Sequence, residues 1–265
     1  MKQPIALTAE GERHLSVLAP LAWLGDGWRD FWRNPVPGLW HGAAFVVFGV
    51  LLLLIAHDQF WLLAGAYSGF LIVGPLVVTG LYEISRGLAR GEKLKTSDAL
   101  QVWMGWDRRL VKFGLLLAFA GSGWVLTSAG FITLFAPHPV NKPVDFLHYV
   151  VLAPQAWVFG IWLLFGGLLA APMFASSVLA IPMLMDKPVS VKQAVAVSWA
   201  VCASHPEAMA VWAMLIMLLV GVGMATAMVG LVVIVPWLAH ASWHAYTELV
   251  PANMVLSEER QSAAR

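Results

Sequence analysis

The chain has 265 residues, of which 60% are hydrophobic and 12% are charged, and its formal net charge at pH 7 is +1. Soluble domains are roughly 45–50% apolar and about 25% charged, so the bilayer must supply part of the solvent for this much apolar surface. The composition therefore argues against a soluble enzyme and gives no basis for a nucleic-acid partner, and the single cysteine, Cys202, excludes an internal disulfide and a multi-cysteine metal site.

The first predicted element is an amphipathic helix at residues 22–34, and the Pro-Val-Pro sequence that follows ends it because proline restricts its own backbone and that of the preceding residue. Its aromatic face is formed by Trp28, Phe31 and Trp32. The side chains expected nearer to water are Arg29, Asp30 and Arg33. Such a helix either lies in the headgroup plane or docks on the protein's own cytoplasmic face.

About six membrane helices are predicted, because one crossing needs ~20 largely apolar residues. The first four are at residues 38–56, 60–82, 110–137 and 150–184. The apolar stretch 206–247 is about twice as long as one crossing requires, and we divide it into two helices at Gly221-Val-Gly223. The alternative is one long kinked helix that ends at Pro236 and is followed by an interfacial helix. No charged residue lies in the middle of any crossing, unlike the crossings of ion-coupled carriers.

Two charged turns, at residues 83–95 and 186–188, each precede an amphipathic stretch, at residues 96–106 and 189–204. With the N-terminus inside, every Lys and Arg except Lys142 falls on the inner side of the membrane. This asymmetry follows the positive-inside rule. It predicts a protein of the bacterial inner membrane whose N-terminus and C-terminus are both cytoplasmic.

The two charged turns belong to a weak internal repeat. The matched pairs are Pro75 with Pro172, Ala99 with Ala194, and Trp103 with Trp199. Both interfacial stretches fall on the same side, so the halves have the same topology, as in parallel repeats. The predicted fold is an all-α polytopic bundle. It has a cytoplasmic segment at 1–37, a helical domain at 38–250 with halves at 60–137 and 155–236, and a polar tail at 251–265.

A polar pattern near the C-terminus suggests a ligand site. His240, His244 and Glu248 follow one another at i, i+4 and i+8, which places them on one face of a helix. Two imidazoles at this spacing can bind a divalent metal ion, with the carboxylate as a third ligand, and a single histidine can bind haem iron. The alternative is that these side chains hydrogen-bond to neighbours or headgroups at the cytoplasmic interface. The sequence requires no cofactor.

A second polar cluster is expected on the same side of the membrane. Its members are Tyr82, Glu83, Arg86, Trp243 and Tyr246. Glu83 and Arg86 are three residues apart and can form an ion pair on one helix face. The cluster forms either a polar site or a charge network that anchors the helix ends.

Two segments carry a resemblance to a known family: the Gly-Pro-Leu, Gly-Leu-Tyr and Ser-Arg motifs within residues 74–86, and His-Ala-Ser-Trp-His-Ala-Tyr at 240–246. With them the chain resembles a bacterial integral-membrane family of unknown function, over roughly residues 20–250. Some members carry the label "cytochrome c oxidase subunit I-like". The resemblance implies at most association with a respiratory complex, because no crossing here has a histidine at its centre to bind haem iron.

Three functions remain open at this point. The first is a non-catalytic accessory, assembly or scaffold subunit, whose partners are the bilayer and another membrane protein or a second copy. The second is a transporter or channel for a small or apolar solute, which requires a cavity near mid-membrane. The residues expected to line that cavity are Tyr67, Ser68, Gln155 or Ser176. The third is a haem or metal site at His240 and His244. No P-loop, GxSxG or GxGxxG motif indicates catalysis.

Overall fold

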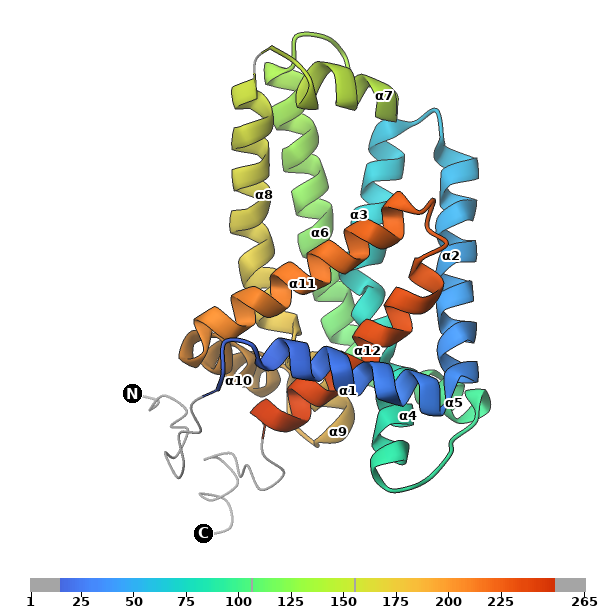
Figure 1. Ribbon diagram of the computed structural model, residues 1–265. Helices are drawn as coiled ribbons and strands as arrows, with labels where there is room; N and C mark the ends of the chain where they lie inside the picture. The colour runs from blue at the N-terminus through green and yellow to red at the C-terminus, as the bar shows by residue number, and fades with distance from the viewer. Residues whose placement is uncertain (1–14, 106, 155, 251–265) are drawn as a thin grey trace.

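The computed structural model describes residues 15–105, 107–154 and 156–250. Within these ranges the chain forms helices and short connections, and no strand occurs. Four long apolar helices run side by side along the molecule (Figure 1). They are α2 (Pro35–Ala56), α3 (Phe60–Val77), α6 (Arg108–Phe135) and α8 (Ala156–Ser177). The predicted all-α helical membrane bundle is therefore confirmed.

Four segments of the described chain are long and apolar enough to cross a membrane. They are Pro35–Ala56, Arg108–Phe135, Trp157–Asp186 and Pro206–Ala225. At 1.5 Å per residue, α2 is about 33 Å long, which matches a hydrocarbon core of about 30 Å. The outward side chains of these helices are large and apolar, for example Ile55 at 74% exposed and Phe119 at 81%. Such surfaces are suited to contact with lipid.

Both charged turns lie at one end of the bundle, which we call the basic end and define by the turns at residues 90–95 and 187–190 (Figure 1). Arg86 Nη1 lies 3.6 Å from Asp186 Oδ1, across the two turns. Arg109, at the start of α6, donates three hydrogen bonds of 2.8–2.9 Å to backbone carbonyls between residues 184 and 189. The two turns are thus on the same side of the bundle, as the distribution of basic residues predicted.

The opposite end, called the far end here, is formed by the connection at residues 57–59 and the loop at 136–142. Lys142 Nζ lies 3.6 Å from Asp58 Oδ1, and the Phe60 amide donates to the Asn141 carbonyl at 2.9 Å. A short helix, α7 (Pro143–Phe146), and a π-helical turn, η1 (Leu147–Val151), cover this end between α6 and α8. The long helices therefore connect two distinct polar ends.

Short helices follow α3 and α8 at the basic end. The predicted crossings at 60–82 and 150–184 both break before their expected ends, near residues 78 and 178–179. The chain then continues as α4 (Thr79–Ala89) and α5 (Thr96–Met104) in one half. In the other it continues as α9 (Ala180–Asp186) and α10 (Val191–Ser204). The same order of elements thus occurs twice, and descent of the halves from one repeat stays a prediction.

Helices α11 (Pro206–Ala225) and α12 (Leu231–Leu249) form a hairpin whose two ends point to the basic end (Figure 1). The chain reverses at residues 226–230, where Ala227 and Met228 have φ values of +50° and +70°. The stretch thus divides into two helices, as predicted, but the break lies at 226–230 and not at 221–223. A single helix ending at Pro236 is wrong, because Pro236 lies inside α12.

The tip of this hairpin packs against the middle of two long helices. Met228 fills the space beside Gly49 of α2, where a Cβ atom would overlap the Met228 side chain. The Tyr67 hydroxyl of α3 donates to the Gly49 carbonyl at 2.8 Å and lies 3.4 Å from Met228 Sδ. The tip therefore packs against the middle of the bundle through Met228 and does not lie among the loops of the far end.

Helix α1 (Ala19–Arg33) lies across the basic end and packs along α12 (Figure 1). Trp23, Leu24 and Phe31 are buried in this contact, whereas Trp32 is 60% exposed. A Cβ atom at Gly27 would lie 2.5 Å from the Ala241 amide nitrogen, so glycine permits the close approach of the two helices. One face of α1 is thus docked on the protein itself, the second of the two alternatives considered above.

Candidate functional site

Helices α1, α4 and α12 hold four polar side chains in one hydrogen-bonded network at the basic end. His240 Nδ1 lies 2.8 Å from Ser85 Oγ, and Ser85 Oγ donates to Asp30 Oδ2 at 2.8 Å. His244 Nε2 lies 2.8 Å from the same carboxylate oxygen. Asp30, Ser85 and His240 are all buried. Asp30 was expected nearer to water, and that expectation is wrong because α4 and α12 supply its partners.

The pKa of Asp30 and the directions of the hydrogen bonds determine which atoms of the network carry protons. Burial alone would raise the pKa of Asp30, but hydrogen bonds from His244 and Ser85 outweigh it and hold this pKa below its usual value. The carboxylate therefore only accepts hydrogen bonds. Because Ser85 gives its single proton to Asp30, the His240 Nδ1 atom must carry the proton that Ser85 accepts.

The His240 ring is neutral at neutral pH. Burial lowers the pKa of His240 to about 4, although the charge of Asp30 opposes this shift. Its Nε2 atom is buried and has no hydrogen-bond partner among the described residues.

This network is suited to holding helices together and not to nucleophilic catalysis. In a Ser-His-Asp triad the histidine bridges the serine and the carboxylate and takes the serine proton. Here the serine is the bridge, and its proton goes to Asp30. Ser85 is also only 1% exposed, so a substrate cannot reach its oxygen. The contacts fix α1 and α4 against α12.

The predicted metal-binding face is present, but its three members have separate partners. Glu248 Oε2 accepts from Trp23 Nε1 at 2.6 Å, and the His244 Nε2 atom is bonded to Asp30. In the part of the chain that the structure describes, no group of three or more His, Cys, Asp or Glu is arranged to hold a metal ion. The face therefore does not form a three-ligand metal site, and binding of a metal or haem at His240 and His244 stays a prediction.

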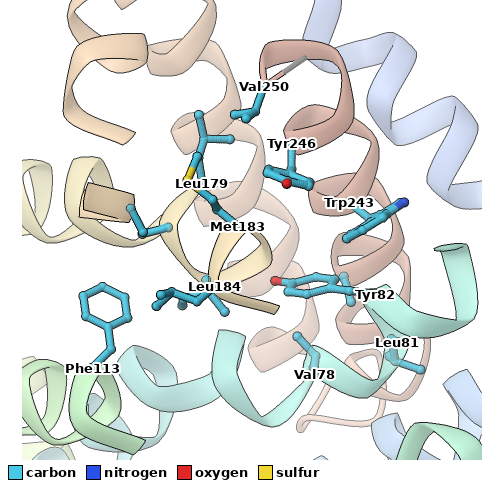
Figure 2. Close-up of a cluster of buried hydrophobic side chains, with 14 of the residues drawn as sticks. Val78, Leu81, Tyr82, Phe113, Leu179, Met183, Leu184, Trp243, Tyr246 and Val250 are labelled. Carbon is cyan, nitrogen blue, oxygen red and sulfur yellow. The ribbon is translucent and has the colours of Figure 1, made fainter. Parts of the chain in front are cut away.

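Three members of the second predicted cluster, Tyr82, Trp243 and Tyr246, lie among apolar residues of α4, α9 and α12 (Figure 2). The Tyr82 and Trp243 rings are stacked with their centroids 6.3 Å apart, and the centroids of the Trp243 and Tyr246 rings are 5.3 Å apart. The Tyr246 hydroxyl donates to Asp186 Oδ2 at 2.7 Å. Burial, and then the hydrogen bond to Asp186, raises the pKa of Tyr246, so the hydroxyl keeps its proton.

Arg86 completes this second cluster. Its Nη2 atom lies 2.5 Å from Glu83, and its Nη1 atom reaches Asp186 on α9. The structure thus brings all five predicted members together and adds Asp186, which sequence reasoning missed. The ion pairs connect the ends of α4 and α9, and a binding role for the cluster stays a prediction.

A cavity of about 530 Å³ lies between α3, α6 and α8 on the side of the far end. Its aromatic lining consists of Phe60, Trp61, Trp124, Phe146 and Trp162. Three hydroxyl groups also line it, those of Tyr67, Ser68 and Ser128, and Met224 of α11 forms part of its wall. Every lining side chain within the described ranges is uncharged.

Two of the four side chains predicted to line a mid-membrane cavity do so, namely Tyr67 and Ser68. Ser176 does not, because its Oγ atom accepts from Trp199 Nε1 at 2.9 Å on another part of the bundle. Gln155 lies outside the described residues. The cavity therefore agrees in part with the position expected for a solute site.

The cavity lies beside the loops of the far end and borders α11 of the hairpin. A smaller cavity of about 270 Å³ among the loop residues, including His138 and Asn141, shares Trp61 and Ile132 with it. On the other side, Met224 of α11 forms part of its wall.

Residues 62–186 match the model of a family described as "Predicted integral membrane protein (DUF2189)". This confirms the resemblance to an integral-membrane family of unknown function. The matched residues run from α3 to the end of α9, a shorter range than the residues 20–250 expected. No curated protein and no solved structure matches the chain. Most of the cavity wall lies in the DUF2189 segment, whereas α1 and α12 lie outside it.

Proposed function

We propose that this chain is a non-catalytic binding protein of the membrane that holds a small lipophilic molecule between α3, α6 and α8. The observation that supports this is the cavity of about 530 Å³. Small-molecule sites commonly measure ~300–1,000 Å³, and aromatic walls with a few placed polar groups are typical of them. Because none of the described side chains that line the cavity is charged, an uncharged molecule dissolved in the bilayer is the favoured ligand.

The close packing of the hairpin on α2 favours binding over free passage. Gly42 of α2 lies so close to the Val232 backbone of α12 that a Cβ atom there would overlap it. Together with Met228 at Gly49, this contact holds the hairpin closely against α2. A transport cycle would therefore require the hairpin to move, whereas a binding or delivery function does not.

Filling the cavity tests the proposal. Ala64 lines the cavity, so Ala64→Phe should exclude the ligand, whereas Ala120→Phe adds the same bulk to the exposed surface of α6. The purified proteins are extracted with organic solvent, and lipophilic compounds are quantified per chain by mass spectrometry. The unmodified chain and Ala120→Phe should retain a compound that Ala64→Phe loses by at least about tenfold. Equal contents in all three proteins would contradict the proposal.

A second candidate function is that of an accessory, assembly or scaffold subunit of a membrane complex, which binds a partner protein or a second copy of the chain. The observation that favours it is an exposed apolar stripe on α5, formed by Leu100, Trp103 and Met104, which are 42–69% exposed. The distribution of Lys and Arg supports placing this end in the cytoplasm of a bacterium, below the inner membrane. Native mass spectrometry after crosslinking should show a partner that Met104→Glu loses and Gln101→Glu keeps. A lone monomer in every case would contradict this function.

A further inference from the structure

Two serine hydroxyls set the polarity of the cavity. Ser128 on α6 is 7% exposed, and its oxygen accepts from Trp162 Nε1 at 2.6 Å. A serine hydroxyl also carries one proton to donate, and no acceptor for it occurs among the described residues. Ser68 on α3 forms no hydrogen bond within the described part of the chain. The cavity therefore presents two unused hydroxyl donors.

The third hydroxyl that lines the cavity, that of Tyr67, already donates its proton within the protein. The Tyr67 proton goes to the Gly49 carbonyl at 2.8 Å, which leaves only the lone pairs of its oxygen for a ligand. A ligand that accepts hydrogen bonds thus finds two donors in an uncharged site. A pure hydrocarbon would leave both donors without a partner, which is unfavourable away from water.

The aromatic side chains favour a flat ligand. Phe146 stacks on Phe60 with centroids 5.3 Å apart and an interplanar angle of 22°, and it contacts the edge of Trp162 at 5.3 Å. Trp124 lies 5.7 Å from Trp162. Aromatic pairs gain from offset stacking and edge-to-face contact, so a planar ring in the cavity can join an arrangement that already exists.

We propose that the cavity selects an uncharged, planar, membrane-soluble molecule with ring carbonyl oxygens, a molecule of the quinone class. Ser128 and Ser68 donate hydrogen bonds to its carbonyl oxygens, and the Phe and Trp side chains hold its ring. This assignment rests on the proposed binding function and names its ligand class. It involves binding alone and requires no electron transfer by the protein.

Two probes of the same shape separate the quinone assignment from simple apolar binding. 2,3-Dimethyl-1,4-naphthoquinone carries two ring carbonyls and has no free ring position for thiol addition, whereas 2,3-dimethylnaphthalene lacks both carbonyls. Binding to the full chain in nanodiscs is measured by equilibrium dialysis and corrected with empty nanodiscs for partition into lipid. The quinone should bind at least about tenfold more tightly than the hydrocarbon, the gain expected from one or two hydrogen bonds.

Serine variants assign the donors. Ser128→Ala should weaken quinone binding by about tenfold and leave hydrocarbon binding unchanged, and Ser68→Ala should act in the same direction. Ser128→Thr keeps a hydroxyl and should restore affinity. Ser122→Ala is the matched control, because that exposed serine of α6 bonds only to the Ala118 carbonyl of its own helix.

The outcomes distinguish the two proposals. Equal binding of both probes, unchanged in every serine variant, would overturn the quinone assignment and leave the binding function standing. If neither probe binds, and Ala64→Phe retains the same compounds as the unmodified chain, both proposals are wrong.

Discussion

Replacing Ser85 by alanine tests whether the buried network at the basic end stabilises the fold. Ser85 donates to Asp30 and accepts from His240, with both distances at 2.8 Å. At 1% exposed, its position cannot be reached by water that would replace the hydroxyl. Ser85→Ala leaves the His240 Nδ1 proton without an acceptor and removes one hydrogen bond from the Asp30 carboxylate. Each buried group left unpaired costs ~1–3 kcal/mol, so the free energy of unfolding should fall by roughly 2–5 kcal/mol.

The measurement is a reversible denaturant titration in mixed micelles, followed by circular dichroism. Ser122→Ala removes the same hydroxyl from an exposed position on α6 and should change stability by less than about 0.5 kcal/mol. A loss for Ser85→Ala no larger than that of this control would refute the reasoning, because the network would then contribute nothing measurable.

Acidification from pH 6.5 to 4 should lower the free energy of unfolding by up to roughly 3 kcal/mol. The His240 pKa is lowered to about 4, so the unfolded chain binds this proton first, and His240→Asn should flatten that part of a stability profile measured against pH. Gly42→Ala should lower the melting temperature, with a cost of about 1–3 kcal/mol, because its Cβ overlaps a carbonyl oxygen of α12. Gly123 has open space around it, so Gly123→Ala should not lower the melting temperature. Equal melting temperatures of the two variants would exclude a tight contact at Gly42. Arg109→Lys should cost about 1–2 kcal/mol in chemical unfolding, because three bonds to carbonyls before α10 are lost. Arg108 is exposed, so Arg108→Lys should leave the free energy of unfolding unchanged. Similar losses of stability in both variants would count against a stabilising role of the Arg109 hydrogen bonds.

The crossings could be predicted from the sequence because the requirement that produces them is local. A charge-free run of sufficient length has to be a helix in lipid, and the predicted range 110–137 corresponds closely to α6 at Arg108–Phe135. The common end of the two charged turns followed in the same way, since basic residues gather on one side of the membrane.

The division of the hairpin could not be predicted in this way. Gly221 and Gly223 suggested a break, but a Cβ at Gly223 would overlap the Leu231 side chain, so this glycine permits α11 to pack closely on α12. The chain reverses instead at Ala227 and Met228, residue types that rarely adopt positive φ and give no turn signal.

The buried network depends on partners that no local pattern connects. Asp30 lies 55 residues from Ser85 and 214 residues from His244 in the sequence. The amphipathic pattern of the first helix assigned its charged side chains to water, and only tertiary packing reverses that for Asp30. The two histidines on one face of α12 indicated that a carboxylate lies nearby, but the local pattern did not identify which carboxylate.

The packing of the first helix on the last one constrains how a growing chain can mature. At ~5–20 residues per second, a ribosome needs roughly 10–40 s to advance from Asp30 to His244. Throughout that interval the Asp30 carboxylate and the Trp23 indole lack their hydrogen-bond partners on α12, because α12 has not yet been translated. Any nascent chain interrupted before α12 therefore exposes the apolar face of α1 that α12 covers in the finished protein.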